Sequence, residues 1–167
     1  TSPLVISATV GDEVIISEAS PLTITVDPAN FAPGEQTIPV EVVNEGGVTS
    51  ITQLAVMIGA LPPIVTVSGL EDGATFEGSF MPGEVVSVTV DVDSQTDVTG
   101  VVYSVDSVEI ATQSEAPFAF DVELLPLGTG SHTLDVTVTN AGGESTTTSR
   151  SFTITVVPTP TPTFTPT

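Results

Sequence analysis

The chain repeats itself at an offset of 96 residues. This offset places Pro21 on Pro117 and Asn44 on Asn140, and it needs no gap from Pro21 to Ile58. Upstream of Pro21 an offset of 95 fits better, so the hairpin expected there differs by one residue. Because turn-forming residues recur in register at this period, the sequence predicts two tandem modules rather than one large fold.

The second copy consists of short segments in which apolar and polar residues alternate. From Val86 to Val92 every second residue is valine, and the residues between them are polar. Six further segments are strand candidates, at residues 64–68, 101–105, 108–112, 117–122, 131–140 and 148–157. Seven strands with one apolar face each can bury those faces only against a second sheet, so the chain is expected to be all-β and to form a β-sandwich of about 95 residues.

Four segments of the second copy resemble a known family as a set. They are Leu70-Glu-Asp-Gly-Ala-Thr75, Val101-Val-Tyr-Ser-Val-Asp106, Ala116-Pro-Phe118 and Gly130-Ser-His-Thr-Leu134. Together they look like the bacterial immunoglobulin-like (Big/Ig-like) repeat of surface proteins, adhesins and accessory regions of secreted polysaccharide hydrolases. The resemblance implies an immunoglobulin-like β-sandwich that acts as a spacer, a stacking unit or an adhesive surface. One departure is Asp106-Ser107, where family members usually have Asp-Gly.

The repeat and the resemblance together predict three regions. Residues 62–157 form a complete Ig-like module, and residues 1–61 form a partial module that lacks the N-terminal strands. Residues 158–167 alternate Pro and Thr, and Pro cannot donate to a β-ladder, so this tail is expected to be an extended linker. Counterparts of residues 62–96 would have to lie before Thr1.

The partial module raises the question of what covers its apolar rows, which include Ile38, Val40 and Val42. Three answers remain open at this stage. The covering strands could belong to preceding residues of a longer protein, or another chain could donate them. Alternatively, residues 1–61 could pack differently, for example against the second module. An uncovered sheet with a free edge would otherwise invite aggregation.

Composition excludes several classes of function. The chain has one Lys or Arg against 21 Asp and Glu, a net charge of −20, and no Cys. This charge opposes binding to nucleic acid or to anionic lipid. Without Lys or Cys there is no Schiff base, thiolate or zinc–thiolate chemistry. We therefore expect no enzyme, and we expect an extracellular or cell-surface location.

The longest uncharged stretch, from Gly46 to Leu70, is long enough to suggest a membrane helix. Pro62-Pro63 interrupts it, and no basic residue flanks it. The stretch therefore indicates a strand, a linker and a second strand, and no direct insertion into a membrane is expected.

One group of residues suggests a metal site. Asp91, Asp93, Asp97 and Asp106 form the densest set of carboxylates in the second copy. Ca²⁺ takes six to eight oxygen ligands, and loops at strand ends suit it. The spacing does not match an EF-hand loop. A solvated acidic face is the alternative interpretation, and no other cofactor is expected.

Three further residues have mainly structural interpretations. His132 is the only side chain that normally titrates near neutral pH, but it begins a strand and aligns with Gln36, so we expect a surface turn residue. Tyr103 lies on an apolar row, and we expect it to pack in the core with its hydroxyl at the rim. Arg150, the single strong cation, is expected at the edge of the sandwich beside a carboxylate.

These observations predict a non-catalytic structural or spacer module of a surface, fibre or multidomain secreted protein. Its partners would be neighbouring domains or other copies of the chain. An alternative is a self-assembling extracellular filament subunit that completes its first module by strand exchange. A weaker alternative is a calcium-dependent adhesin or a polysaccharide-binding accessory module, although the few aromatic residues argue against sugar stacking.

Overall fold

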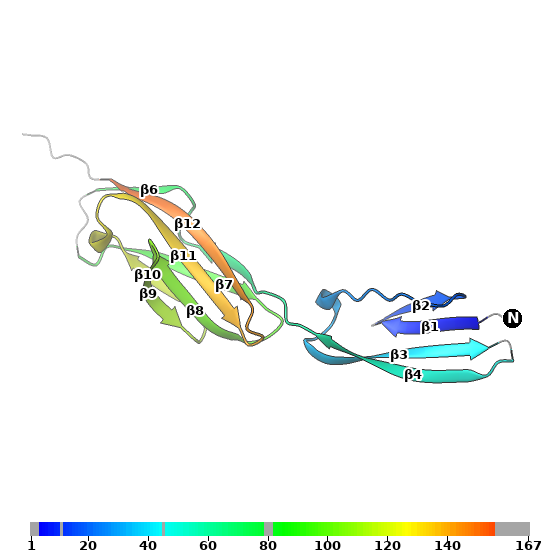
Figure 1. The fold of residues 1–167 in the computed structure, drawn as a ribbon. Coiled ribbons are helices and arrows are strands. Elements are labelled where there is room, and N and C mark those ends of the chain that lie inside the picture. The colour runs from blue at the N-terminus through cyan, green and yellow to red at the C-terminus, as the bar shows by residue number, and fades with distance from the viewer. Residues whose placement is uncertain (1–3, 11, 45, 79–81, 156–167) are drawn as a thin grey trace, which may run out of the picture. The chain divides into compact units, whose positions relative to one another are not determined.

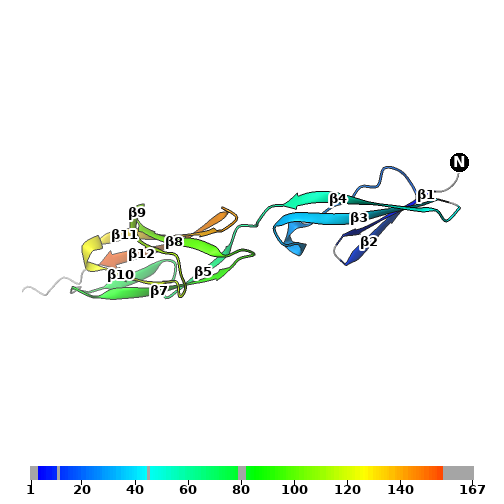
Figure 2. The same ribbon diagram turned by 90° about the horizontal axis from the view of Figure 1, so that it is seen from below.

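The computed structural model describes residues 4–10, 12–44, 46–78 and 82–155. The chain divides into two compact units (Figures 1 and 2). The first contains residues 4–61 and the second contains residues 62–141 and 145–155. The Pro/Thr tail predicted at 158–167 lies outside the described residues.

The first unit is built on one antiparallel sheet. Its strands are β1 (Leu4–Val10), β2 (Glu13–Ser17), β3 (Gly34–Asn44) and β4 (Thr49–Ile58), in the order β2-β1-β3-β4. Asn44 shapes the β3–β4 hairpin, because its side-chain Oδ1 accepts a hydrogen bond from the Val48 amide at 3.0 Å. Gly47 in the same turn has a φ of 72°, a conformation that glycine adopts at little cost.

The strand register gathers one set of apolar side chains on the inner face of this sheet, while Val14, Ile51 and Met57 lie exposed on the other face. Ile6 pairs with Val42, and Ile38 pairs with Leu54, so these side chains point the same way. Their burial is uneven, since Ile38 is 2% exposed while Leu54 is 47% exposed. The inner face of the first sheet is therefore covered only in part.

An extended segment between β2 and the short 3₁₀ turn η1 (Pro28–Asn30) belongs to this unit. Leu22, Ile24 and Val26 in this segment are half-buried, whereas Thr23 and Thr25 are exposed. The alternation is that of a strand with one buried face, but the segment pairs with no strand among the described residues.

The second unit contains two sheets. One has the order β10-β7-β5 and the other has the order β6-β12-β11-β8-β9. The strands are β5 (Ile64–Ser68), β6 (Ala74–Glu77), β7 (Val85–Asp93), β8 (Val98–Val105), β9 (Val108–Gln113), β10 (Ala119–Glu123), β11 (Gly130–Asn140) and β12 (Ser145–Thr155), with a 3₁₀ turn η2 (Leu125–Leu127). Figure 2 shows the two sheets facing each other.

The predicted inward rows form the core of the second unit. Its most buried side chains include Val88, Val101, Tyr103, Leu134, Val136, Val138, Phe152 and Ile154. Residues i and i+2 of a strand share a face, which is why these rows follow the period of two seen in the sequence. The prediction of an all-β, immunoglobulin-like chain is confirmed.

The sequence prediction missed the strand β6. β6 runs parallel to β12, with Ala74 opposite Phe152, whereas β5 is antiparallel to β7. The chain thus changes sheets between β5 and β6. Gly69 permits this change, because it has a φ of 87° and a Cβ there would collide with the Ser87 carbonyl oxygen.

Element boundaries in the two units are related by the offset seen in the sequence. β3 and β11 start and end 96 residues apart. The order β2-β1-β3-β4 in the first unit corresponds to β9-β8-β11-β12 in the second. In the second unit the other sheet, β10-β7-β5, covers the inner face of this arrangement, and the described residues of the first unit form no such second sheet.

Candidate functional site

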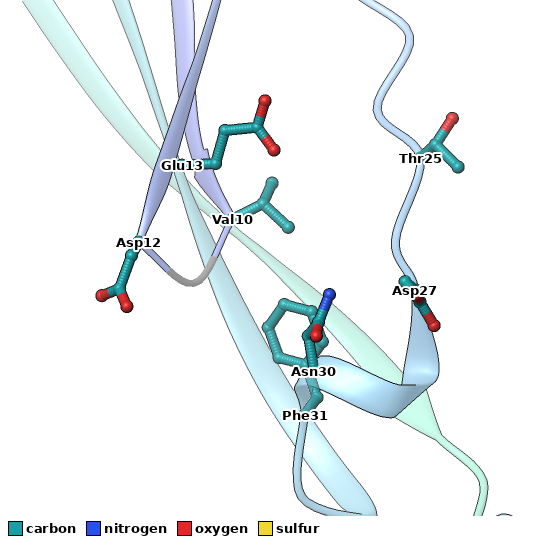
Figure 3. A pocket seen from close by; sticks show the side chains of 7 residues that line it. All are labelled: Val10, Asp12, Glu13, Thr25, Asp27, Asn30 and Phe31. Carbon is teal, nitrogen blue, oxygen red and sulfur yellow. The ribbon is translucent and has the colours of Figure 1, made fainter.

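A cavity of about 650 Å³ lies in the first unit between the β1–β2 hairpin and the segment that leads into η1 (Figure 3). It is lined by Val10, Asp12, Glu13, Thr25, Asp27, Asn30 and Phe31. Figure 3 shows Val10 and Glu13 on the hairpin, across the space from Thr25 and Asp27, with Asp12 pointing away from it. The Asp27 carboxylate accepts a hydrogen bond from the Ala29 amide at 3.0 Å and so caps η1.

A second cavity, of about 350 Å³, occupies the corresponding place in the second unit. It is lined by Val105, Ile110, Phe120, Asp121, Val122, Glu123, Pro126 and Leu127. At the offset of 96 residues Asp27 falls on Glu123 and Phe31 falls on Leu127. Both cavities thus lie between a hairpin and the connection that carries a 3₁₀ turn.

The two cavities differ in chemistry. Asp12, Glu13 and Asp27 are among the residues that line the first, whereas Asp121 and Glu123 line the second beside mainly aliphatic and aromatic residues. The shared position is therefore a property of the fold, and the cavities give no sign of a common ligand.

His132 lies in a polar cluster at the start of β11. Its Nδ1 lies 2.7 Å from Oδ2 of Asp106, and its Nε2 lies 3.3 Å from the Gly128 carbonyl oxygen. Asp106 Oδ1 also accepts a hydrogen bond from the Thr133 amide at 2.9 Å. Both ring nitrogens therefore face acceptors, the Asp106 carboxylate at Nδ1 and the Gly128 carbonyl at Nε2.

The hydrogen bond from His132 holds the pKa of the Asp106 carboxyl below its usual range, and the bond from the Thr133 amide lowers it further. His132 is 8% exposed, so the expectation of a surface turn residue is wrong. Position 132 has the same parity as Leu134 and Val136, and this signal places it on the inward row. With both nitrogens facing acceptors and the ring buried, His132 connects β11 to the β8–β9 turn.

The structure does not bring the four predicted calcium ligands together. Asp91 and Asp93 share the outer face of β7, opposite Thr66 and Ile64 of β5. Asp97 precedes β8 and Asp106 follows it, so about 30 Å of extended chain separates them at ~3.3 Å per residue. Asp106, moreover, is bonded to His132.

Within residues 4–10, 12–44, 46–78 and 82–155, no group of three or more His, Cys, Asp or Glu side chains is arranged to hold a metal ion. A calcium site that uses Asp91 and Asp93 stays a prediction. If it forms, CaCl₂ raises the melting temperature more than MgCl₂ at the same concentration, and Asp93→Ala removes the difference. Equal effects of the two salts would contradict it.

Tyr103 occupies the position expected of it. Its ring is fully buried and stacks on Phe120 with centroids 5.3 Å apart. Its hydroxyl donates to Gln113 Oε1 at 2.9 Å, and Gln113 Nε2 donates to the Ala119 carbonyl at 2.8 Å. Burial raises the pKa of the Tyr103 hydroxyl. This chain of bonds links β8 and β9 of one sheet to β10 of the other.

Arg150 differs in part from its expected role. Its guanidinium donates to the carbonyl oxygens of Val67 and Ser149 at 3.3 and 3.2 Å. Its charge is one of the causes that lower the pKa of Asp72, although the main causes are hydrogen bonds from the Ser151 hydroxyl and amide. Arg150 therefore ties β12 to β5 through a backbone carbonyl.

Comparison with known proteins supports the fold. Residues 63–136 match the model of the bacterial Ig domain, which confirms the predicted resemblance over this stretch. A search of curated proteins finds no match. No helix among the described residues is long and apolar enough to cross a membrane.

Solved structures with a similar fold include fibronectin(III)-like modules of Clostridium thermocellum CbhA. They share 16% sequence identity over 93% of this chain and 80% of the other, with a TM-score of 0.50. A protocadherin gammaB7 EC3–6 cis-dimer structure is 14% identical over 94% of this chain and 41% of that one, with a TM-score of 0.44. A Ca²⁺-stabilised ice-binding adhesin of an Antarctic bacterium is 16% identical over 94% and 41%, with a TM-score of 0.33. At these identities the likeness concerns the fold alone.

Proposed function

We propose that this chain is a non-catalytic, extracellular structural segment: two successive immunoglobulin-like modules that space or connect other parts of a secreted or surface protein. The observation that carries the proposal is the recurrence of one strand order in both units, β2-β1-β3-β4 and β9-β8-β11-β12. Successive modules of one fold are a common way to build an extended connector. The match of residues 63–136 to a bacterial Ig domain agrees with this role.

The polar side chains of the second unit support a structural role. His132 bonds Asp106, Tyr103 bonds Gln113, and Asp72 bonds Ser151. Each pair joins two segments of the same unit, and the polar groups of each pair are used in hydrogen bonds to each other. Catalysis needs groups that are free to bind a substrate or to move a proton.

The extracellular location is supported by composition. The net charge of −20 comes from 21 acidic residues with one strong cation, and such a surface repels other acidic polymers and favours solubility. The absence of Cys is neutral on this point, because it neither requires nor excludes an oxidising compartment.

Light scattering after size-exclusion chromatography tests the proposal on the whole chain. Once the missing strands of its first module are supplied, a spacer elutes as a monomer over about a hundredfold range of concentration. Affinity electrophoresis in gels containing polysaccharides, with and without a chelator, serves as the second measurement. Retardation by a polysaccharide would contradict the spacer role, and its loss with the chelator would indicate a calcium-dependent adhesin instead.

The partly covered sheet of the first unit favours a second candidate, a filament subunit joined by strand exchange. Leu54 on the inner face is 47% exposed, and a free sheet edge is a template for pairing with another chain. Negative-stain electron microscopy of the concentrated chain distinguishes the candidates. Rods would support the filament, and separate particles would support the spacer.

A further inference from the structure

In the first unit the extended segment between β2 and η1 has no strand partner among the residues that the structure describes. Its equivalent in the second unit, β10, pairs with β7. β10 lies antiparallel to β7, with Phe120 opposite Val88 and Val122 opposite Val86. The Val90 amide donates to the Phe118 carbonyl at 2.8 Å, and the Leu124 amide donates to the Glu84 carbonyl at 3.2 Å. The even-numbered residues from 118 to 124 therefore direct their backbone groups toward β7.

The first unit repeats this strand without its partner. At the offset of 96 residues, Thr23–Asp27 falls on β10, Ala119–Glu123. Ile24 and Val26 are half-buried while Thr23 and Thr25 are exposed, the same alternation as in β10. Yet residues 23–27 pair with no strand in the part of the first unit that the structure describes.

The inner face of the first-unit sheet is also exposed where a covering strand is absent from the described residues. Leu54 aligns with Arg150, whose guanidinium reaches the Val67 carbonyl of β5. In the first unit no described strand takes the place of β5, and Leu54 is 47% exposed. The two uncovered features thus correspond to the two strands, β7 and β5, that close the second unit.

We propose that the first unit is a strand acceptor: Thr23–Asp27 pairs antiparallel with a β-strand from outside these 167 residues that has β-branched apolar side chains at alternate positions. The required chemistry is that of β7, in which Val88 is fully buried and Val90 is 5% exposed. By the β10–β7 register, apolar residues of the incoming strand lie opposite Ile24 and Val26. This inference rests on the proposed relation between the two modules.

The net charge of the chain affects how tightly an incoming strand binds. The chain carries a net charge of −20, so at low salt an acidic strand such as β7, which contains Asp91 and Asp93, binds more weakly than an uncharged strand with the same apolar residues. Main-chain hydrogen bonds supply general affinity in strand addition, while alternate side chains supply selectivity.

A labelled peptide with the sequence of residues 84–93 tests the proposal by fluorescence polarisation against the whole chain. Salt at about 0.5 M screens the repulsion between the acidic peptide and the acidic protein. We expect saturable binding. A matched peptide with Val86, Val88 and Val90 replaced by Thr keeps the β-branched shape but loses apolar surface, and we expect it to bind at least about tenfold more weakly.

Two proline variants locate the acceptor edge. Val26→Pro removes an amide that faces the incoming strand, whereas Thr25→Pro removes one that faces away. We expect Val26→Pro to weaken peptide binding about tenfold, and Thr25→Pro to change it less than about twofold. Circular dichroism checks that both variants keep their strand content. Changes in the amide chemical shifts of the unaltered chain when the peptide is added locate the binding site without any variant.

Three results would overturn the proposal: no binding at a peptide concentration of about 1 mM, equal binding of both peptides, or shift changes confined to residues 62–155. None of these results bears on the spacer role. That role fails independently if the chain binds polysaccharide, whatever the peptide does.

Discussion

Asp72 and Asp106 each use one carboxylate to hold a turn against a distant strand. Asp72 accepts hydrogen bonds from the Ser151 amide and hydroxyl at 2.8 and 2.7 Å. Asp106 accepts from His132 and from the Thr133 amide at 2.7 and 2.9 Å. These bonds favour the ionised carboxylates, and they lower the pKa of both groups.

Substitution of Asp106 tests the link between this pairing and pH. A folded-state pKa below the unfolded value of about 3.9 means that the pairing stabilises the native state above that pH. The contribution is lost as the pH falls through the folded-state value. We expect Asp106→Asn to lower stability at pH 7 by about 1 kcal/mol, a figure discounted because the side chain is 48% exposed.

The measurement is the melting temperature between pH 2 and pH 7, roughly the range in which carboxylates titrate. As the pH falls, the melting temperature of Asp106→Asn should decrease less steeply than that of the wild type. Glu115→Gln, which removes an exposed carboxylate of the same unit, serves as the control and should leave the slope unchanged. Parallel acid limbs for wild type and Asp106→Asn would contradict the assignment.

Tyr103 offers a second test at the residue scale. Tyr103→Phe keeps the ring stack on Phe120 but leaves Gln113 Oε1 without its donor. We expect a loss of about 1–2 kcal/mol in the free energy of unfolding, measured with urea. Tyr103→Ala also removes the buried ring and should cost about 3–5 kcal/mol. Similar losses for both variants would mean that the hydroxyl, rather than packing, dominates.

At the residue scale the sequence was informative where a side chain follows the period of its strand. Tyr103 and Val88 were placed correctly on inward rows by that period. For His132 the two sequence signals conflict, because its polarity and its Gln36 counterpart indicate a surface position, whereas its parity indicates the inward row on which it lies. Its bond to Asp106 joins residues 26 positions apart, and pairing of this kind depends on tertiary contacts that strand periodicity does not encode.

Among the elements, the change of sheet between β5 and β6 depends on glycine. Gly69 and Gly73 both have positive φ, at 87° and 78°. A Cβ on Gly69 would meet the Ser87 carbonyl, while nothing lies within 4 Å of a Cβ on Gly73. The two positions thus share a backbone conformation and differ in the space around them.

Gly69→Ala should therefore destabilise the second unit far more than Gly73→Ala. The control carries only the conformational cost of alanine at positive φ, about 1–2 kcal/mol. Gly69→Ala adds a backbone collision that requires β5 or β7 to shift, and we expect a total loss above about 3 kcal/mol. The free energy of unfolding of both variants is measured with urea. Equal losses would show that β5 or β7 shifts to accept the added Cβ at no cost in stability.

Sequence periodicity does not predict a strand whose conformation depends mainly on the strand it pairs with. β6 has only four residues, Ala74–Glu77, and its strand character comes from pairing with β12. Thr23–Asp27 is the reverse case, since it has strand-like alternation but no described partner. Periodicity shows which residues prefer a sheet, and a ladder still needs a second strand.

For the whole molecule, the excess of acidic residues predicts a dependence on salt. A net charge of −20 places repelling carboxylates on the surface, and the screening length falls from about 30 Å at 0.01 M to about 8 Å at 0.15 M. We expect the melting temperature to rise by several degrees over this range. A variant with Glu18, Glu77 and Glu115 replaced by Gln should show a smaller rise, and an equal rise would indicate an effect unrelated to repulsion.

The parallel pairing of β6 with β12 has a mechanical consequence. Ala74–Glu77 lies near the beginning of the second unit, and Phe152–Thr155 lies at its described end. When the two ends of the unit are pulled apart, these strands are drawn in opposite directions along their length. The hydrogen bonds between them are then loaded in shear and resist together, whereas a ladder pulled open from one end breaks bond by bond. The β6–β12 ladder therefore opposes separation of these two segments along the strand direction.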